Sequence, residues 1–427
     1  MPARHALQLL RELSAPSDQR IGLRVTAEAE RRIRQGHPWL YAEAIRKQSR
    51  EGRSGDLAVV YDRRDRFLAV GLYDPDSPIR VRILQRHRPS PIDRAWLEAR
   101  LAEAVRLREP LRASSTTGYR LVHGENDGLP GVVVDRYDDT LVLQLYTAAW
   151  AAHLRELVEA LSAVWPATRL FLRLSRATQA TFRRSHHLED GMVLAGPPLQ
   201  GPVIFCENDL AFEAHPIHGQ KTGFFLDQRD NRAKAGTLAQ GAAVLDVFAY
   251  TGGFSVYAAR GGAREVVSVD AGRPALEAAR RNMARNRHHA AVRAAAHDLV
   301  AGDAFDVLTQ LKRARRQFDV VILDPPAFAN SRAEVPQALL AYGRLTRLGL
   351  GVLRSGGTLV ISSCSGQVDE KPFFAAVHHA ATQTKRPLRE LARTAHPLDH
   401  PVRFAEGAYL KCLFATDQGP RPHKPRR

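Results

Sequence analysis

The chain has 427 residues, which at about 150 residues per domain allows two or three domains; 44% of the residues are hydrophobic and 25% are charged. These fractions are those of ordinary globular proteins and argue against a wholly disordered or collagen-like chain. Three cysteines are too few for a disulfide framework in a chain of this size. No apolar run approaches the roughly 18 residues that cross a bilayer. Because the N-terminal residues also do not resemble a signal peptide, we expect a cytoplasmic protein.

Net charge is the most informative part of the composition. Lysine and arginine together number 62 against 45 aspartates and glutamates, which gives a net charge of +17, and only 8 of the basic residues are lysines. Arginine binds phosphate in a bidentate manner and stacks on bases. The surplus favours a polyanionic partner, with nucleic acid first and an anionic membrane surface second. A basic surface without such a partner is the simpler alternative.

The first part of the chain, residues 21–89, predicts a small β-rich domain. Its apolar and polar residues alternate in short runs separated by turn residues, as in DLAVVYDR and RFLAVGLYD. In the next run, IRVRILQR, Arg80 and Arg82 fall on one face of a strand, which is either a solvated face or one that contacts phosphates. A proline-rich linker leads to residues 94–215, where a helix over 94–107 and several strand-like runs predict an α+β domain.

The third region, residues 216–416, predicts a parallel sheet with helices on both faces. Its short apolar runs, VLDVFAY, EVVSVD, FDVVILDPP and GTLVISSCS, each end in polar or turn-forming residues, and helical stretches separate them. In such sheets a ligand binds beyond the carboxyl ends of the strands. The candidate site residues are therefore those that directly follow each run.

A glycine pair follows the first of these runs. Residues 249–254, AYTGGF, lack the spaced glycines of G-x-G-x-x-G, which favours a nucleoside ligand without a pyrophosphate. Asp270 ends the second run, where a carboxylate can bind both ribose hydroxyls of adenosine. Asp303 follows a third possible strand and could accept a hydrogen bond from an adenine amino group. For both aspartates the alternative is a helix cap or a turn residue.

Two further runs bring a carboxylate and a thiol to the same rim. Asp324 ends one run and is followed by two prolines, which prevent a helix from starting and hold the carboxylate at the sheet edge. Cys364 follows the next run and is either a nucleophile or an inert free cysteine. Cys206 and Cys412 lie within strand-like runs, so for them we favour simple packing.

These residues together resemble a known family, the class I S-adenosylmethionine-dependent rRNA methyltransferases of the bacterial large-subunit type that makes 5-methylcytidine. The resemblance covers roughly residues 21–415. The motifs that carry it are Gly36-His37-Pro38-Trp39 and Tyr73 to Arg82 in the first region, His123 to Gly131 and Asp135 in the second, and Gly219 to Arg229, Asp246 to Ser255, Asp324-Pro325-Pro326 and Ser363-Cys364-Ser365 in the third.

The resemblance implies a Rossmann-like methyltransferase domain over 216–416, an N-terminal PUA-like β-barrel that binds RNA over 21–89, and a middle α+β domain over 94–215. It also implies S-adenosylmethionine as the cofactor, ribosomal RNA as the partner, a homodimer, and neither a metal ion nor a membrane. The residues expected at the cofactor are Gln228, Asp246, Tyr250, Thr251, Gly252, Gly253, Asp270 and Asp303. Those expected at RNA are His37, Trp39, Arg80 and Arg82, and those expected to carry the chemistry are Cys364 and Asp324.

The chemistry that the resemblance implies starts from a weak nucleophile, cytosine carbon-5. A thiolate that adds to carbon-6 activates it, and the base must be unstacked for this attack. Cys364 would be the thiolate, and Asp324 would hold the amino edge of the base. A related branch carries a second cysteine beside the Pro-Pro motif, where this chain has Asp324-Pro325-Pro326-Ala327. The group that removes the carbon-5 proton therefore stays open.

Other functions also stay open. One is methylation of a guanine or an exocyclic amine in RNA, which an Asp-Pro-Pro motif also suits and which needs no covalent cysteine. Another is a non-catalytic RNA-binding assembly factor that retains the fold. A dinucleotide oxidoreductase is disfavoured because G-x-G-x-x-G is absent.

Overall fold

The computed structural model describes residues 9–419, which belong to two compact units. The first unit comprises residues 9–208 together with 214–226 and 398–407. The second comprises residues 209–213, 227–397 and 408–419. The expected division into three domains, at 21–89, 94–215 and 216–416, stays a prediction.

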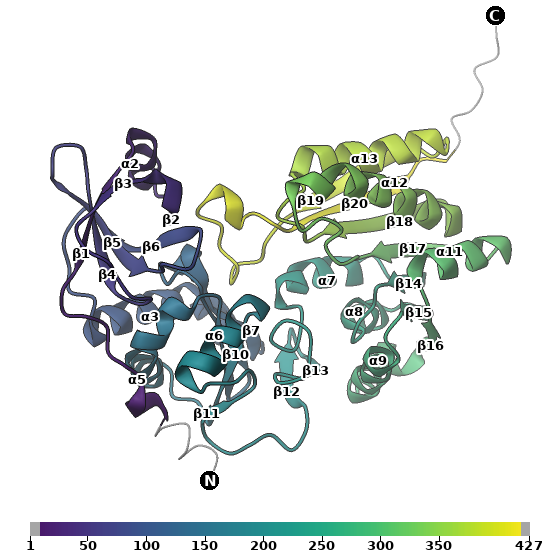
Figure 1. Cartoon of the computed structure of the whole chain (residues 1–427). Helices are drawn as coiled ribbons and strands as arrows, with labels where there is room; N and C mark the ends of the chain where they lie inside the picture. The colour runs from purple at the N-terminus through teal and green to yellow at the C-terminus, as the bar shows by residue number, and fades with distance from the viewer. Residues whose placement is uncertain (1–8, 420–427) are drawn as a thin grey trace, which may run out of the picture. The chain divides into compact units, whose positions relative to one another are not determined.

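A six-stranded sheet occupies the N-terminal part of the first unit (Figure 1). Its order is β2-β6-β5-β4-β1-β3, with β1 parallel to β4 and the other neighbours antiparallel. Helix α2 begins after Thr26, whose Oγ1 accepts a hydrogen bond from the backbone N–H of Ala29 at 3.2 Å. The elements are β1 (Ile21–Val25), α2 (Ala27–Arg34), β2 (Trp39–Tyr41), η1 (Ala42–Ala44), β3 (Ile45–Gln48), β4 (Leu57–Tyr61), β5 (Phe67–Tyr73) and β6 (Ile79–Arg86).

The same unit contains a five-stranded sheet of order β11-β10-β9-β8-β7, with helices α3 and α5 packed against each other. Helix α3 spans the predicted residues and begins after Asp93, whose Oδ1 accepts from the N–H of Trp96 at 2.9 Å. The elements are α3 (Arg94–Leu107), α4 (Glu109–Arg112), β7 (Gly118–His123), η2 (Gly124–Asp127), β8 (Val132–Tyr137), β9 (Thr140–Leu145), η3 (Ala148–His153), α5 (Leu154–Val164), β10 (Arg169–Leu174), α6 (Arg176–His186), β11 (Val193–Ala195) and β12 (Val203–Glu207).

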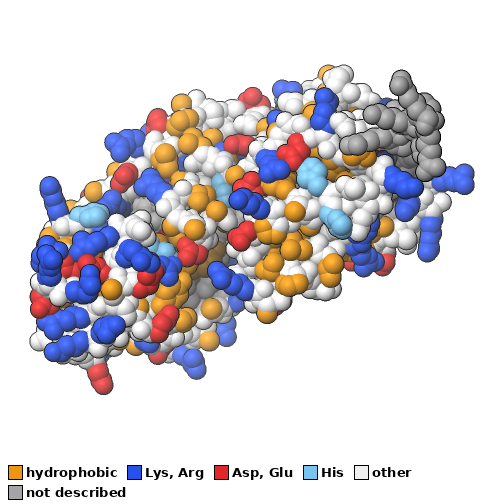
Figure 2. All heavy atoms as spheres, turned by 90° about the horizontal axis from the view of Figure 1, so that it is seen from above, with side chains coloured by type: hydrophobic (Ala, Val, Ile, Leu, Met, Phe, Trp, Pro, Cys, Tyr) orange, Lys and Arg blue, Asp and Glu red, His pale blue; other side chains and the backbone are white. Residues whose placement is uncertain are grey.

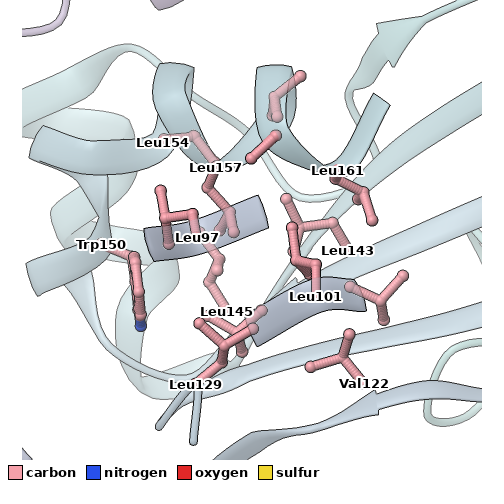
Figure 3. Close-up of a cluster of buried hydrophobic side chains, with 14 of the residues drawn as sticks. Leu97, Leu101, Val122, Leu129, Leu143, Leu145, Trp150, Leu154, Leu157 and Leu161 are labelled. Atoms are coloured by element: carbon pink, nitrogen blue, oxygen red, sulfur yellow. The ribbon is translucent and has the colours of Figure 1, made fainter. Parts of the chain in front are cut away.

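One hydrophobic core joins the two sheets of the first unit. Leu57, Leu72 and Leu84 of the six-stranded sheet belong to the same buried cluster as α3, α5 and the five-stranded sheet. Burying one such side chain contributes about 1.5–3 kcal/mol, so the shared cluster holds the two sheets together. Figure 3 shows its centre, to which the second sheet and its helices contribute Leu97, Leu101, Val122, Leu129, Leu143, Leu145, Trp150, Leu154, Leu157 and Leu161.

The second unit is built on a seven-stranded sheet of order β16-β15-β14-β17-β18-β20-β19. Its strands are parallel except β20, which is antiparallel to both neighbours. Helix α12 packs against α11 and α13, and α8 packs against α7 and α9 (Figure 1). The elements of this part of the chain are β13 (Leu210–Ala214), η4 (Leu226–Gln228), α7 (Arg229–Gly236), β14 (Ala243–Val247), α8 (Gly253–Arg260), β15 (Glu265–Asp270), α9 (Arg273–Arg285), α10 (Ala290–Ala294), β16 (Ala296–Ala301), α11 (Ala304–Arg313), β17 (Phe318–Leu323), η5 (Arg332–Glu334), α12 (Val335–Val352), β18 (Leu353–Ser363), α13 (Glu370–Gln383), β19 (Leu388–Thr394), η6 (Ala405–Gly407) and β20 (Lys411–Asp417). Of these, η6 belongs to the first unit, and β13 and η4 each have residues in both units.

The predicted Rossmann-like class is confirmed by this doubly wound sheet. The chain runs from β14 outward to β15 and β16, and then returns to β17 on the other side of β14. Such a reversal leaves a crevice beyond the carboxyl ends of the two central strands. Asp324 directly follows β17, and Cys364 directly follows the neighbouring β18. Among the described helices, none is long and apolar enough to cross a membrane.

Candidate active site

The turn after β14 has an unusual backbone. Phe248, Tyr250 and Gly252 have φ angles of 66°, 47° and 75°, a left-handed conformation that costs non-glycine residues energy and clusters at functional sites. A Cβ at Gly252 would lie 2.8 Å from the Cβ of Ala279 on α9, so no side chain fits there. The turn therefore brings bare backbone and the first N–H groups of α8 to the crevice, as a closely bound ligand requires.

Asp270, the last residue of β15, is fixed beside this turn. Its Oδ2 accepts from the N–H of Tyr250, and its Oδ1 accepts from the N–H of Gly272, each at 2.8 Å. A carboxylate can accept about four hydrogen bonds, so these two contacts orient the group and leave room for two ligand hydroxyls. This placement suits the predicted contact to a ribose, which stays a prediction.

Asp246 lies deep in β14 and is completely buried. Its Oδ2 accepts from the hydroxyl of Ser255 at 2.6 Å, and that hydroxyl lies 2.6 Å from the one of Ser268. Burial, opposed by the hydrogen bond from Ser255, raises the pKa of Asp246 to about 7. Within residues 9–419, Asp246 Oδ1 and the hydroxyl of Thr251 are buried without a hydrogen-bond partner. Such unpaired polar atoms beside a bare backbone turn fit a ligand that carries donors, such as the ammonium of an amino acid.

A chain of polar side chains surrounds the carboxylate of Asp324. The amide nitrogen of Gln228 donates to Asp324 Oδ1 at 2.7 Å, and the hydroxyl of Ser362 donates to the same oxygen. The amide oxygen of Gln228 accepts from Asn231 at 2.5 Å, which fixes the orientation of the amide, and Asn231 in turn accepts from Thr394 at 2.5 Å. Asp324 is therefore held in place directly by Gln228 of η4 and Ser362 of β18, as a residue that must position a substrate requires.

Cys364 lies at the same rim and is half-buried. Its Sγ lies 3.8 Å from the backbone oxygen of Pro325, the residue after Asp324. The thiol and the carboxylate therefore come from the ends of adjacent strands. The hydroxyl of Tyr342 donates to the hydroxyl of Ser363, the residue before the cysteine, at 2.9 Å.

Lys411, at the start of β20, is a site residue that the sequence analysis missed. Its ammonium is buried and donates to the backbone oxygens of Ser365 at 2.6 Å and Tyr409 at 3.1 Å, and to that of Val368. Burial lowers the pKa of Lys411 to about 8, although Cys364 lies close enough to oppose this electrostatically. A positive charge beside a thiol favours the thiolate. No sequence signal points to this residue except a lysine within an otherwise apolar strand.

The remaining residues of the second unit take structural positions. Asp303 caps α11, because its Oδ1 accepts from the N–H groups of Phe305 at 2.9 Å and Asp306 at 3.2 Å. The capping alternative thus describes the observed contacts, and the adenine contact of Asp303 stays a prediction.

Cys412 is fully buried in β20, and burial holds the pKa of its thiol well above the usual value, which makes it unreactive. In residues 9–419 no group of His, Cys, Asp or Glu side chains could hold a metal ion.

The four residues expected at RNA all lie in the first unit but in different surroundings. His37 and Trp39 are half-buried, and the indole N–H of Trp39 donates to Glu125 Oε1 at 2.9 Å. The guanidinium of Arg80 lies 5.9 Å from the ring centre of Tyr73.

Arg82 departs from the expected open strand face: it is 8% exposed, donates to the backbone oxygen of Ile79 at 3.3 Å, and has its pKa lowered by burial. Its burial argues against a direct phosphate contact.

Basic residues are nevertheless abundant on the surface of this unit. Figure 2 shows Lys and Arg side chains, with Asp and Glu among them, over the part of the first unit that contains the six-stranded sheet. A contact to RNA by His37, Trp39 and Arg80 stays a prediction.

Comparisons with known proteins agree with this geometry. Residues 23–86 match the model of the PUA-like domain, and residues 120–403 match that of S-adenosylmethionine-dependent methyltransferases. A Deinococcus radiodurans protein named ribosomal RNA large subunit methyltransferase is 48% identical over 409 residues, covering 94% of this chain and 99% of that protein. A Pseudoalteromonas translucida protein named ribosomal RNA large subunit methyltransferase I is 35% identical over 393 residues, covering 91% and 97%. The structure of SMU.776 complexed with SAH shares the fold, with a TM-score of 0.79 at 24% identity over 92% of this chain and 99% of that one.

Proposed function

Because the chain belongs to the family of S-adenosylmethionine-dependent methyltransferases, we propose that it methylates carbon-5 of a cytidine in large-subunit ribosomal RNA through a transient bond to Cys364. S-adenosylmethionine is the cofactor of this family. The names of two relatives, the PUA-like match and the net charge of +17 support ribosomal RNA as the substrate. The cytoplasmic location and the homodimer stay predictions.

One observation carries the choice of carbon-5: a half-buried thiol and a fixed carboxylate come from the ends of neighbouring strands. Cys364 follows β18, Asp324 follows β17, and Sγ lies 3.8 Å from the backbone oxygen of Pro325. Methylation of a nitrogen would need the carboxylate but not the thiol. Lys411 supports the same choice because it lies close enough to Cys364 for the two groups to interact electrostatically, and reactive cysteines lie beside basic groups.

The residues around the turn after β14 fit the cofactor. The carboxylate of Asp270 would hold the ribose hydroxyls, and the unpaired Oδ1 of Asp246 with the hydroxyl of Thr251 would take the donors of the methionine end. Gly252 keeps the backbone close enough for contact. When bound, S-adenosylmethionine supplies a methyl group on a positively charged sulfur, which a nucleophilic carbon can accept.

The roles of Cys364 and Asp324 follow from what cytosine lacks. The thiolate of Cys364 forms a bond to carbon-6, and the electrons of the carbon-5–carbon-6 double bond then make carbon-5 nucleophilic. Asp324, held by Gln228 and Ser362, binds the amino edge of the ring and steadies the charge that develops there. After carbon-5 carries the methyl group, loss of its proton and expulsion of Cys364 restore the aromatic ring.

The test uses the purified full-length protein, labelled S-adenosylmethionine and unmodified large-subunit rRNA, followed by nucleoside mass spectrometry. We expect 5-methylcytidine with the wild-type protein. The Cys364→Ala variant should lose at least about 10³-fold in turnover while it still binds the cofactor. Cys206→Ala, a change of the same kind at a half-buried cysteine in β12, is the matched control and should keep full activity.

Two results would contradict the proposal in different ways. If Cys364→Ala still methylates, or if the product is a methylated guanosine or a methylated amine, the enzyme acts without a covalent cysteine. If no methyl group reaches rRNA while the protein still binds both RNA and cofactor, the chain is an RNA-binding factor that retains the fold.

A further inference from the structure

A pocket of about 320 Å³ opens in the first unit where two sequence motifs meet. Gly36 and Pro38 of the first motif form one part of its wall, and residues 125–128 of the second motif form another. Neither motif contributes a residue to the candidate active site. The end of β6, two residues of α3, and Arg403 with Phe404 complete the lining.

Some charges of the lining are already paired. Asp127 accepts from the buried guanidinium of Arg108 at 2.7 Å and from the N–H of His123 at 2.6 Å. Arg100 donates to Gln85 at 2.8 Å and to Glu103 at 3.1 Å. These contacts fix Asp127, Arg100, Gln85 and Glu103 in place, so these four side chains form the frame of the pocket.

Other charges of the lining keep capacity for a ligand. Glu125 accepts from the indole of Trp39 through Oε1, and within residues 9–419 its Oε2 accepts no hydrogen bond. Arg86 donates to the backbone oxygen of Gly36 at 2.8 Å, while its Nε is buried and has no hydrogen-bond partner in the described part of the chain. The side chain of Arg403 is exposed, and its backbone is anchored to Asn126 at 2.7 Å. A ligand that fits must therefore offer donors to a carboxylate and negative charge to guanidinium groups.

An aromatic wall adds the third requirement. Phe404 lines the pocket and packs edge-to-face on Trp39, with ring centres 5.2 Å apart at 77°. His37 lies edge-on to the ring of Phe404, with ring centres 6.3 Å apart. An aromatic ring held in this way offers a surface on which an unpaired base can stack.

We propose that this pocket binds one unpaired guanosine nucleotide of the RNA substrate. Guanine presents two neighbouring donors, N1–H and the amino group, to a single carboxylate, here Glu125, whereas the pairing edges of adenine, cytosine and uracil each offer a lone donor group. Arg86 and Arg403 bind the phosphate, and Phe404 stacks on the base. The inference rests on the proposed function in that RNA is the partner, but it uses none of the residues of the candidate active site.

The indole of Trp39 gives a direct readout because its N–H is bonded to Glu125. The chain has 4 tryptophans, so a full-length protein labelled with ¹⁵N-tryptophan gives a simple spectrum, and Trp39→Phe assigns the signal. We expect 5′-GMP to shift the Trp39 signal to saturation. The nucleotide 5′-IMP, which lacks the amino group, should bind about 5- to 150-fold more weakly. Trp150 and Trp165, which do not line the pocket, should not move.

Two variants with the same chemical change sharpen the test. Glu125→Gln keeps an oxygen for Trp39 but removes the charge, so it should abolish the preference for 5′-GMP over 5′-IMP. Glu103→Gln changes an exposed carboxylate on the same lining and should leave that preference unchanged. With rRNA as substrate, Glu125→Gln should raise KM severalfold and leave kcat unchanged.

Two outcomes overturn the inference. The Trp39 signal does not respond to 5′-GMP, or it responds equally to 5′-GMP, 5′-AMP and inorganic phosphate, in which case the pocket is only an anion site. Failure here is separable from failure of the proposed function. A protein that methylates cytidine but does not bind 5′-GMP refutes the pocket alone, and one that binds 5′-GMP selectively but methylates no RNA refutes the proposed function alone.

Discussion

Two buried carboxylates, Asp127 in the first unit and Asp246 in the second, have opposite surroundings. In the first unit, Asp127 is buried against the guanidinium of Arg108, which also donates to three backbone oxygens and is itself completely enclosed. In the second unit, Asp246 is also buried, but its hydrogen bonds come from the neutral residue Ser255, and one of its oxygens has no partner within residues 9–419. A paired buried charge supports the fold, whereas an unpaired one costs stability unless a ligand completes it. The difference separates residues that hold the protein together from those kept for function.

The largest effect on stability should come from breaking the paired charge. Asp127→Asn keeps the shape of the side chain but leaves Arg108 buried without its counter-ion, which should cost about 3–5 kcal/mol of unfolding free energy. Urea denaturation of the full chain measures this. Glu103→Ala, which removes an exposed partner of Arg100, is the control and should cost about 0–1 kcal/mol. Similar losses in the two variants would show that the buried pair does not support the fold.

The next prediction concerns Asp246, whose effect on the stability of the fold should depend on pH. The pKa of Asp246 is about 7 in the folded protein and about 3.9 in an unfolded chain, so the folded state holds the proton more tightly. Its contribution to stability is therefore complete below about pH 4 and is lost as the pH rises to about 7.

Asp246→Asn replaces the carboxyl group with an amide that does not ionise, so the loss of stability between about pH 4 and 7 should disappear. Compared with the wild type, the variant should gain stability on the order of a few kcal/mol between pH 4 and 7 and should bind S-adenosylmethionine more weakly. Urea denaturation across this pH range and calorimetric titration of the cofactor measure the two effects. A stability difference that does not change with pH would mean that Asp246 is ionised throughout, or that its charge is compensated.

A smaller effect should follow from a side chain in the turn after β14. Gly252 and Gly356 have nearly the same φ, 75° and 77°, but a Cβ meets Ala279 at 2.8 Å in the first case and nothing within 4 Å in the second. Gly356→Ala should therefore lose about 1 kcal/mol from backbone strain alone. Gly252→Ala should lose about 1–3 kcal/mol more from overpacking and bind the cofactor more weakly. Equal losses would mean that α9 moves aside to accept the methyl group.

How far the sequence predicts the candidate site depends on where each residue lies in the fold. In a parallel sheet the site lies at strand ends, so short apolar runs were enough to place Asp270, Asp324 and Cys364 on one rim. The Rossmann-like class follows from the same runs. Lys411 could not be found in this way, because β20 inserts between β18 and β19 and its pairing depends on residues distant in the sequence. The pocket of the first unit was equally out of reach, since segments near residues 36, 86, 125 and 403 build it and only the folded chain brings them together.

Single residues mark the limits of such predictions. The alternation of residues 79–86 placed Arg82 on an expected open face, but the second sheet and its helices share a core with this domain, and Arg82 is enclosed beside Asp74 at 3.8 Å. Asp303 shows the opposite limit. A carboxylate after a strand and before a helix can face a ligand or cap the helix, and only the folded structure shows that Asp303 caps α11.

The most direct test of the central claim traps the bond between Cys364 and the base. Large-subunit rRNA transcribed with 5-fluorocytidine in place of cytidine carries a fluorine that cannot leave as a proton does, so the reaction stops after the methyl group has been accepted. We predict a protein–RNA complex that survives denaturation, requires S-adenosylmethionine, maps to the peptide containing Cys364, and is absent from Cys364→Ala. No stable complex with the wild type, from a preparation that methylates ordinary rRNA, would contradict the covalent route.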